Sequence, residues 1–303
     1  MSDSPDTPRD ADADKVRRLR ELLPATGAGI YLDTAYRGPL PAETHAAMAE
    51  AEEWELRVGR AAEGREEDFA QKRDEARAVI AALIAADPDD IRLVAAADEP
   101  KHAPLVDPLT GERIAGARAE IDATLAVGAI PVDVSVLGAD RVYFAGDRWL
   151  LGPEGIGAVW ERVHGSSRRD HELGRTQVLG LARSIGWLEM YVGLDWVFAR
   201  GKSLAERLYT QLAATDGVDV LTPAAGLATI VVFRLSAWPV DDALDELRRR
   251  VFAIVGQTAD GAIRASIGWF NTEDEIDRFA AAVAELARHT PQTLPRRPTL
   301  LVH

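Results

Sequence analysis

Few residues of this chain combine a reactive type with a spacing that could support chemistry. The 303 residues include no cysteine, which excludes disulfides, thiolate metal sites and a cysteine nucleophile. His102, His164 and His171 show neither metal-ligand spacing nor a partner pattern, so surface or core roles are favoured. The sequence therefore predicts no metal site.

Arg148 and Arg264 lie in segments of distinctive sequence, and either guanidinium can bind an anion. Arg148 can form an ion pair with Asp147 or Asp122, or its planar guanidinium can bind a phosphate. Arg264 lies in a strand-like segment, where it can bind a carboxylate ligand or form a surface ion pair. Lys101 lies in an irregular segment and could in principle supply an amine, although a solvated side chain is the more usual role of such a lysine.

The overall charge narrows the choice of partners. A formal net charge of -14 argues against nucleic acid, because phosphate binding needs a basic surface. The N-terminal sequence MSDSPDTPRDADAD lacks the basic and apolar regions of a signal peptide, and no stretch reaches the length of a membrane span. We therefore expect a cytoplasmic protein that binds neither nucleic acid nor a membrane.

Strands and helices alternate over roughly the first two thirds of the chain. Helical spacing of apolar residues predicts two helices between residues 42 and 86, with a break at 63–65. The segment 96–118 has no period and several helix and strand breakers, which indicates a long loop of a kind that is unusual in a compact domain. The alternation predicts an α/β layer with a mostly parallel sheet. Its strands are expected at 91–95, 119–122, 141–144 and 155–160.

The last third of the chain reads as an α+β domain. Strands are predicted at 229–233 and 262–267, and Thr272 and Glu275 form a capping box that opens a final helix. The predicted organisation is a disordered tail, an N-terminal segment that contains a strand at 29–33, a truncated large domain, a C-terminal domain and an extended tail. Their respective limits are 1–11, 12–40, 41–195, 196–290 and 291–303.

Three segments of the chain form a distinctive series. The first is Tyr31-Leu-Asp-Thr-Ala35 with Gly38-Pro-Leu-Pro41, and the second runs from Asp122 through Ala145-Gly-Asp-Arg-Trp149 to Gly157. The third is Ile263-Arg-Ala-Ser-Ile-Gly-Trp-Phe270 with Asn271-Thr272. In this order they resemble the class V aminotransferases, a pyridoxal-phosphate family that includes cysteine desulfurases and isopenicillin N epimerase-like enzymes.

The resemblance implies a fold and a set of functional residues. The fold would be a shortened aminotransferase-type large domain plus an α+β C-terminal small domain. In the family, a lysine amine forms a Schiff base with the cofactor, an aspartate pairs with the pyridine nitrogen, and an arginine receives the substrate carboxylate. Carried over by position, the aspartate is Asp122, the arginine is Arg264, and Asp33 lies on the substrate side. The lysine position falls on Arg148 and the preceding histidine position on Asp147, which makes Asp122, Asp147 and Arg148 the candidate cofactor-side residues.

Two features of the chain depart from the family pattern. A guanidinium is always charged and cannot serve as a Schiff-base amine, so Arg148 removes the covalent anchor. The stretch that would supply the ring-stacking residue and the phosphate loop is reduced to 96–118, several tens of residues shorter than in the family. We therefore expect no covalent cofactor, while pyridoxal phosphate could still bind non-covalently.

Three functions stay open on these grounds. The first is a binding or regulatory protein with a degenerate cofactor site, forming a homodimer as the family does and taking a small carboxylate or phosphate ligand. The second is a pyridoxal-phosphate enzyme that acts on an amino acid by transamination, epimerisation or elimination. The third is a cofactor-free biosynthetic enzyme that uses the remnant cleft.

Overall fold

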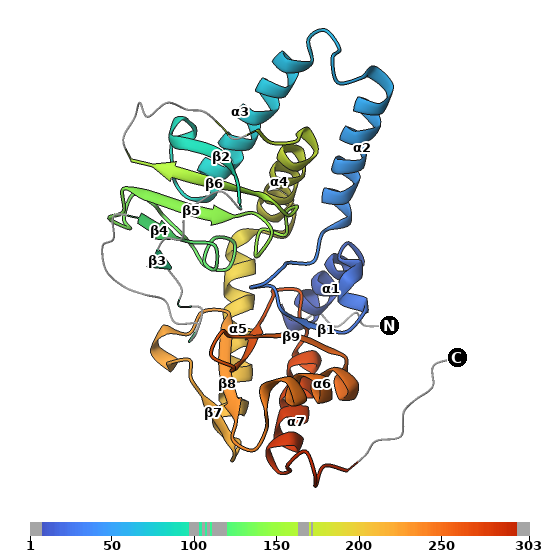
Figure 1. The fold of residues 1–303 in the computed structure, drawn as a ribbon, viewed down its shortest axis with the longest axis vertical. Helices are drawn as coiled ribbons and strands as arrows, with labels where there is room; N and C mark the ends of the chain where they lie inside the picture. The colour runs from blue at the N-terminus through green and yellow to red at the C-terminus, as the bar shows by residue number, and fades with distance from the viewer. Residues whose placement is uncertain are drawn as a thin grey trace, which may run out of the picture.

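Two five-stranded sheets organise the chain, one above the other in the view of Figure 1. The structure is a computed structural model, and it describes residues 8–96, 103–104, 107, 110, 120–162, 170 and 172–295. The α/β class predicted from the sequence is confirmed.

The first sheet has the strand order β2-β6-β5-β4-β3. Its strands are β2 (Ile91–Ala95), β3 (Ala103–Pro104), β4 (Glu120–Asp122), β5 (Arg141–Ala145) and β6 (Ile156–Glu161). Strand β6 runs antiparallel to both β2 and β5, whereas β4 runs parallel to β3 and β5. The sheet is therefore mixed rather than mostly parallel. The connection 146–155 is too short for a crossover helix, so β5 and β6 pair as antiparallel neighbours.

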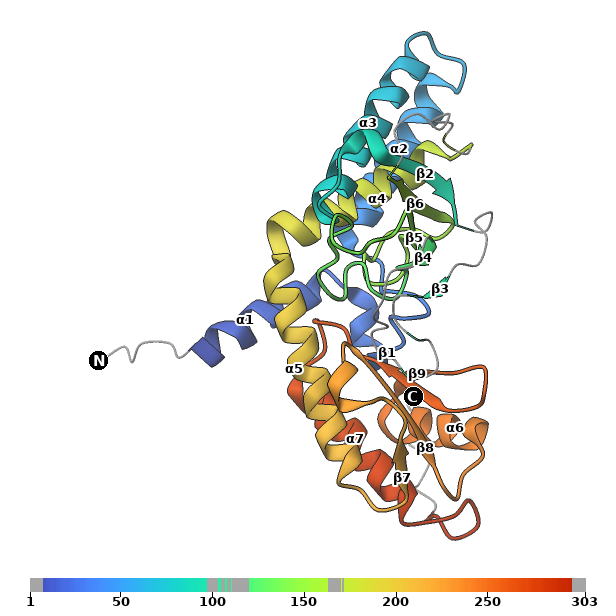
Figure 2. The same cartoon turned by 90° about the vertical axis from the view of Figure 1, so that its left-hand side faces the viewer.

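Three helices cover one side of this sheet, as Figure 2 shows. Helices α2 (Ala42–Val58) and α3 (Arg65–Leu83) form a hairpin at the top of the molecule, and α4 (Arg175–Trp187) packs against both. The break between the first two helices falls where the sequence predicts it. Apolar side chains from the helices and the sheet fill the first core, among them Ile80, Leu93, Phe144 and Ile185.

The second sheet has the strand order β1-β9-β10-β8-β7 and joins the two ends of the chain. Its strands are β1 (Ile30–Leu32), β7 (Val218–Val220), β8 (Ile230–Leu235), β9 (Ala253–Gln257) and β10 (Ile263–Ser266). Strand β1 pairs parallel with β9, and the remaining pairs are antiparallel. Helices α5 (Leu194–Ala213), α6 (Val240–Val251) and α7 (Glu273–Ala287) pack around this sheet. The β1 pairing carries Asp33 to the strand that bears Arg264.

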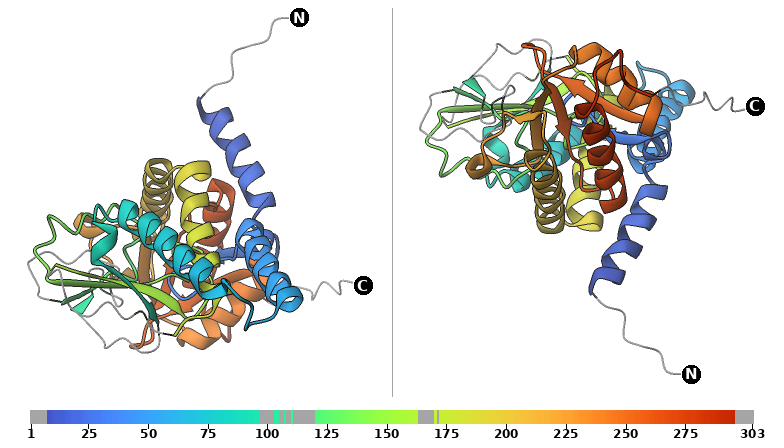
Figure 3. Two further views of the ribbon diagram at one scale, coloured as in Figure 1. Left: turned by 90° about the horizontal axis from the view of Figure 1, so that it is seen from above. Right: turned by 90° about the horizontal axis from the view of Figure 1, so that it is seen from below.

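The N-terminal helix α1 (Pro8–Glu21) extends away from the body of the molecule, as seen in Figure 3. It begins inside the segment 1–11 for which the sequence predicts disorder, because Pro8 suits the first turn of a helix. Lys15 connects this helix to residues 192–196. Its Nζ donates to the Val192 carbonyl at 2.8 Å and lies 4.0 Å from the centre of the Trp196 ring. Residues 1–7 and most of the predicted tail 291–303 lie outside the described residues.

Candidate functional site

A tight turn after β1 carries the first residues of the site. The amides of Tyr36 and Arg37 both donate to the Asp33 carbonyl, at 3.0 and 3.1 Å. Ser266 of β10 holds the same turn, because its hydroxyl donates to the Leu32 carbonyl and accepts from the Ala35 amide. The turn is thereby fixed to the second sheet.

The end of this turn contacts the connection between β5 and β6, residues 146–155. The Gly38 amide donates to the Asp147 carbonyl at 2.8 Å. A Cβ at Gly38 would collide with the Arg148 carbonyl, so only glycine allows this approach. The site therefore forms where the turn of the second sheet meets the connection that leaves the first sheet.

Asp147 is the centre of a compact ion-pair cluster in this region. Its Oδ2 lies 3.1 Å from Arg37 Nε and 3.1 Å from Arg148 Nη1, and its side chain is only 6% exposed. Arg37 Nε also lies 3.3 Å from an oxygen of Glu154, which is largely exposed. Burial raises the pKa of the Asp147 carboxyl, while the Arg37 charge opposes that rise. Arg148 thus pairs with Asp147, the first of the two partners that the sequence allows.

Both guanidinium groups also lie near one aromatic ring. The Cζ atoms of Arg37 and Arg148 are 4.8 and 5.7 Å from the centre of the Tyr36 ring, which is half exposed. Cation–π attraction adds to the pairing with Asp147 and fixes the Arg148 side chain further. Sequence reasoning missed Tyr36 and Arg37. Their only signal was adjacency to Gly38 in the first distinctive segment.

Asp122 lies at the end of β4, and its side chain accepts a hydrogen bond from a residue close to it in the sequence. Its Oδ1 accepts the Thr124 amide at 2.8 Å, and the Thr124 hydroxyl accepts the Ala145 amide at 3.1 Å. This carboxylate therefore helps to join β4 to β5. Within the described residues, no ion pair links Asp122 to Arg148.

Arg264 and Asp33 meet at the other end of the turn. Arg264 Nη2 lies 3.3 Å from Asp33 Oδ1, and their side chains are 14% and 18% exposed. Burial raises the pKa of the Asp33 carboxyl, and both the charge and the hydrogen bond of Arg264 oppose that rise. Gly256 of β9, the neighbour of Arg264 in the sheet, leaves the space that the Asp33 carboxylate occupies.

The lysines of the chain lie elsewhere. Lys15 contacts Val192 and Trp196, Lys72 pairs with Glu75 at 2.9 Å, and the exposed Lys202 lies 3.8 Å from Glu206. The fourth and last lysine, Lys101, lies outside the described residues. None of the three described lysines contacts Asp122 or the Asp147 cluster.

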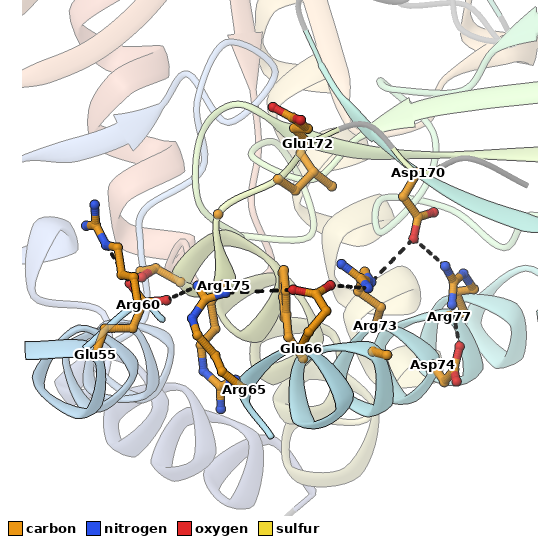
Figure 4. A pocket seen from close by; sticks show the side chains of 15 residues that line it. Glu55, Arg60, Arg65, Glu66, Arg73, Asp74, Arg77, Asp170, Glu172 and Arg175 are labelled. Atoms are coloured by element: carbon orange, nitrogen blue, oxygen red, sulfur yellow. Dashed lines mark hydrogen bonds and ion pairs between the residues drawn. The ribbon is translucent and has the colours of Figure 1, made fainter. Parts of the chain in front are cut away.

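A large cavity of about 1060 Å³ lies away from these residues, between the α2–α3 hairpin and the segment 170–176. Figure 4 shows its arginines and carboxylates pairing with one another. Glu55 binds both Arg60 and Arg65, and Asp170 binds Arg77. The ion pair between Arg175 of α4 and Asp68 of α3 ties the hairpin to α4, although Nε of Arg65, Arg77 and Arg175 is buried without a hydrogen-bond partner.

Two kinds of feature are missing from the part of the chain that the structure describes. It contains no group of histidine and acidic side chains that could hold a metal ion. Among the same residues, no helix is both long and apolar enough to cross a membrane.

Comparison with known proteins identifies the family. The sequence profile of the class V aminotransferases matches residues 110–171 and 175–279, together more than half of the chain. The chain belongs to the class V aminotransferase family.

Several relatives within this family are described as cysteine desulfurases. The chain is 27% identical over 193 residues to cysteine desulfurase IscS of Klebsiella pneumoniae, covering 52% of this chain and 47% of the relative. It is 27% identical over 212 residues to a desulfurase described as probable from Halobacterium salinarum, covering 56% and 50% of the two chains. The chain thus spans about half the length of these curated relatives.

Solved structures share the fold. The apo cysteine desulfurase from Thermococcus onnurineus superposes with a TM-score of 0.75 at 16% identity, covering 90% of this chain and 98% of that one. The cysteine desulfurase CsdA of Escherichia coli gives a TM-score of 0.72 at 18% identity, covering 88% and 97%. At such low identity these matches establish the fold alone.

The family implies pyridoxal phosphate, and the residues present do not fit its covalent attachment at Arg148. A guanidinium cannot act as a neutral nucleophilic amine, and this one is held by Asp147 and Tyr36. Asp122, the residue that the resemblance assigns to the pyridine nitrogen, accepts the Thr124 amide through its Oδ1. The Arg148 side chain therefore cannot form a Schiff base with the cofactor.

Proposed function

We propose that this class V family member carries no covalent pyridoxal phosphate and acts as a binding protein for a small ligand with a carboxylate or phosphate group. The observation that carries the proposal is the Arg148 guanidinium, which the resemblance assigns to the position of the family lysine and which is paired with Asp147 at 3.1 Å. A lysine amine at that position would have to be free to react, whereas this guanidinium is permanently charged and held in place.

The anion-binding part of the proposal rests on Arg264. The resemblance assigns it to the position of the family arginine that receives a carboxylate, and guanidinium geometry suits carboxylate and phosphate oxygens. Its only polar partner among the described residues is Asp33, through one contact of 3.3 Å. The predicted homodimer and cytoplasmic location stay predictions.

An absorbance titration tests this function. Purified wild-type chain is mixed with pyridoxal phosphate, and the spectrum is compared with that of the free cofactor before and after borohydride. The proposal expects no protein-bound Schiff-base band and no change on reduction. A band that develops in proportion to the protein and disappears with borohydride would refute it.

A second function is an active pyridoxal-phosphate enzyme acting on an amino acid. The cysteine desulfurase relatives favour it, as does Asp122 at the end of β4, which the resemblance assigns to the family aspartate. Desulfuration by the usual route is disfavoured, because the chain has no cysteine to accept the persulfide. Turnover of an amino acid that depends on added cofactor would establish this alternative over the first.

A further inference from the structure

A second cavity follows helix α4 and lies apart from the residues discussed so far. Helix α4 packs against both α2 and α3, and all three helices line this groove. Its volume is about 800 Å³, which lies within the range typical of small-molecule sites. The lining includes none of Asp147, Arg148 and Arg264, so the groove is a separate candidate site.

Small side chains keep the groove open along its length. Ala47 and Ala51 of α2 and Ala182 and Gly186 of α4 line it. A Cβ added at Gly186 would meet only the Met190 side chain, at 3.5 Å. The α4 side of the groove therefore has free space where most helices would place a larger side chain.

The two ends of the groove differ in chemical character. At the start of α4, the Arg175 guanidinium lies over the Trp54 ring, with its Cζ 4.5 Å from the ring centre. Beyond the other end of the helix, the rings of Trp187 and Tyr191 stack with their centres 6.4 Å apart. Tyr191 and Met190 are 63% and 85% exposed there. One end is therefore charged and the other is aromatic and apolar.

Arg175 has donors that no described residue uses. Its side chain is 8% exposed, its Nη1 pairs with Asp68 Oδ2 at 2.5 Å, and its Nε is buried without a hydrogen-bond partner. Buried donors are normally satisfied, so the Nε edge of this guanidinium lacks an acceptor. A carboxylate fits such an edge through two parallel hydrogen bonds. Four basic and three acidic residues line the groove, so its local charge does not oppose an anion.

The dimensions of the groove decide between an extended chain and a helix of a partner. Spread over the 13 residues of α4, about 20 Å, the volume gives a mean cross-section of about 40 Å². A helix with its side chains is about 10 Å or more across and needs about 80 Å². The groove is therefore too narrow to seat a helix, whereas an unbranched chain fits along it.

We infer that this groove binds a free long-chain carboxylate of the fatty-acid type. The ligand carboxylate accepts hydrogen bonds from the Nε edge of Arg175, and the alkyl chain follows α4 past Gly186 toward Trp187 and Tyr191. The inference goes beyond the proposed function, because it assigns a second site, on other helices, to a different class of ligand.

Isothermal titration with a series of amphiphiles tests the site. Octanoate, decanoate and dodecanoate vary the chain length, and decyltrimethylammonium carries the opposite charge on a chain of the decanoate type, all below the concentrations at which they form micelles. The variants are Arg175→Gln, which removes the guanidinium, and Gly186→Leu, which fills the groove midway. Arg248→Gln is the control, because this arginine forms an exposed pair on α6 outside the groove. Circular dichroism verifies each fold.

The expected pattern separates the head group from the chain. In the wild type and Arg248→Gln, affinity should rise about two- to fourfold with each methylene from octanoate to dodecanoate. Decyltrimethylammonium should bind at least about tenfold more weakly than decanoate. Arg175→Gln should weaken decanoate about tenfold and abolish this preference for the anion. Gly186→Leu should leave octanoate nearly unchanged and remove the gain from longer chains.

Several results would overturn the inference. Wild type that binds none of the three carboxylates, or binds the cation as tightly as decanoate, has no such site. Dodecanoate binding that survives Gly186→Leu places the chain elsewhere. A wild-type dimer that Gly186→Leu converts to a monomer in sedimentation would show that a second copy covers the groove. The Arg175→Gln comparison stays decisive for the head group if Gly186→Leu does not fold. These titrations contain no pyridoxal phosphate, so their failure is distinct from that of the proposed function, which shows as a borohydride-sensitive band.

Discussion

Glu275 connects the two ends of the chain near the site. It lies in the first turn of α7, where its oxygens accept from Arg20 Nη2 at 2.7 Å and Arg20 Nη1 at 3.1 Å. The same carboxylate accepts the Thr272 amide and the Asn271 side-chain amide. We predict that Glu275→Ala destabilises the protein far more than the loss of an ordinary ion pair.

The magnitude follows from the burial of this carboxylate. Removing one partner of a buried ion pair costs about 3–5 kcal/mol, because the remaining charge is left unpaired. Arg20 is 21% exposed and can regain some water, which lowers this to about 2–4 kcal/mol. Losing the reciprocal helix cap adds about 1 kcal/mol. The free energy of unfolding should therefore fall by about 3–5 kcal/mol, or about 5–8 °C in melting temperature for a chain of this length.

Asp277 on the same helix provides the matched control. Its carboxylate binds Arg207 through two hydrogen bonds of 2.7 and 2.6 Å, but its side chain is 43% exposed. Because water screens an exposed pair, Asp277→Ala should cost only about 0.5 kcal/mol. Urea unfolding followed by circular dichroism measures both variants. A loss for Asp277→Ala as large as that for Glu275→Ala would refute the argument that burial decides.

Two further predictions concern the residues around Arg148. Burial raises the pKa of the Asp147 carboxyl, so the folded state binds the proton of this carboxyl more tightly than the unfolded chain does. The contribution of the carboxyl to stability is therefore greatest below about pH 4 and is lost as the pH rises through the raised pKa. In urea unfolding between pH 4 and 7, the stability of wild type relative to Asp147→Asn should therefore decline, and a rise would contradict the assignment. Gly38→Ala should cost about 2 kcal/mol or more in the same assay, because its Cβ collides with the Arg148 carbonyl. Gly27→Ala, whose Cβ meets nothing within 4 Å, should be nearly neutral, and equal losses for the two would show that the approach at Gly38 is not close.

Local signals in the sequence predicted the elements well. The strands at 91–95, 141–144 and 155–160 are confirmed as β2, β5 and β6, and the capping box of Thr272 and Glu275 is confirmed at the start of α7. These features depend on neighbouring residues, so apolar periodicity and capping chemistry are enough to predict them. The direction of a strand cannot be predicted in this way, because it depends on how each connection crosses the sheet. The antiparallel β6 therefore escaped prediction.

The site was harder to predict because its contacts are distant in the sequence. Arg148 had two candidate partners, and only the meeting of the β1 turn with the β5–β6 connection shows that Asp147 is the one. Arg37 pairs with Asp147 although 110 positions separate the two residues in the sequence, and no local pattern marks Arg37 as a site residue. Asp33 and Arg264 are separated by 231 positions. The resemblance named both as substrate-side residues, but their direct contact depends on the pairing of β1 with β9.

The absence of a covalent cofactor is tested most directly by borohydride reduction followed by mass mapping. The wild type and Arg148→Lys are incubated with pyridoxal phosphate, reduced and digested, and the modified lysine is located among Lys15, Lys72, Lys101, Lys202 and the introduced residue. We predict that the wild type carries no adduct in proportion to the protein. An adduct at the introduced lysine in the variant would show that only the amine is missing. A stoichiometric adduct on any lysine of the wild type, Lys101 included, would contradict the account.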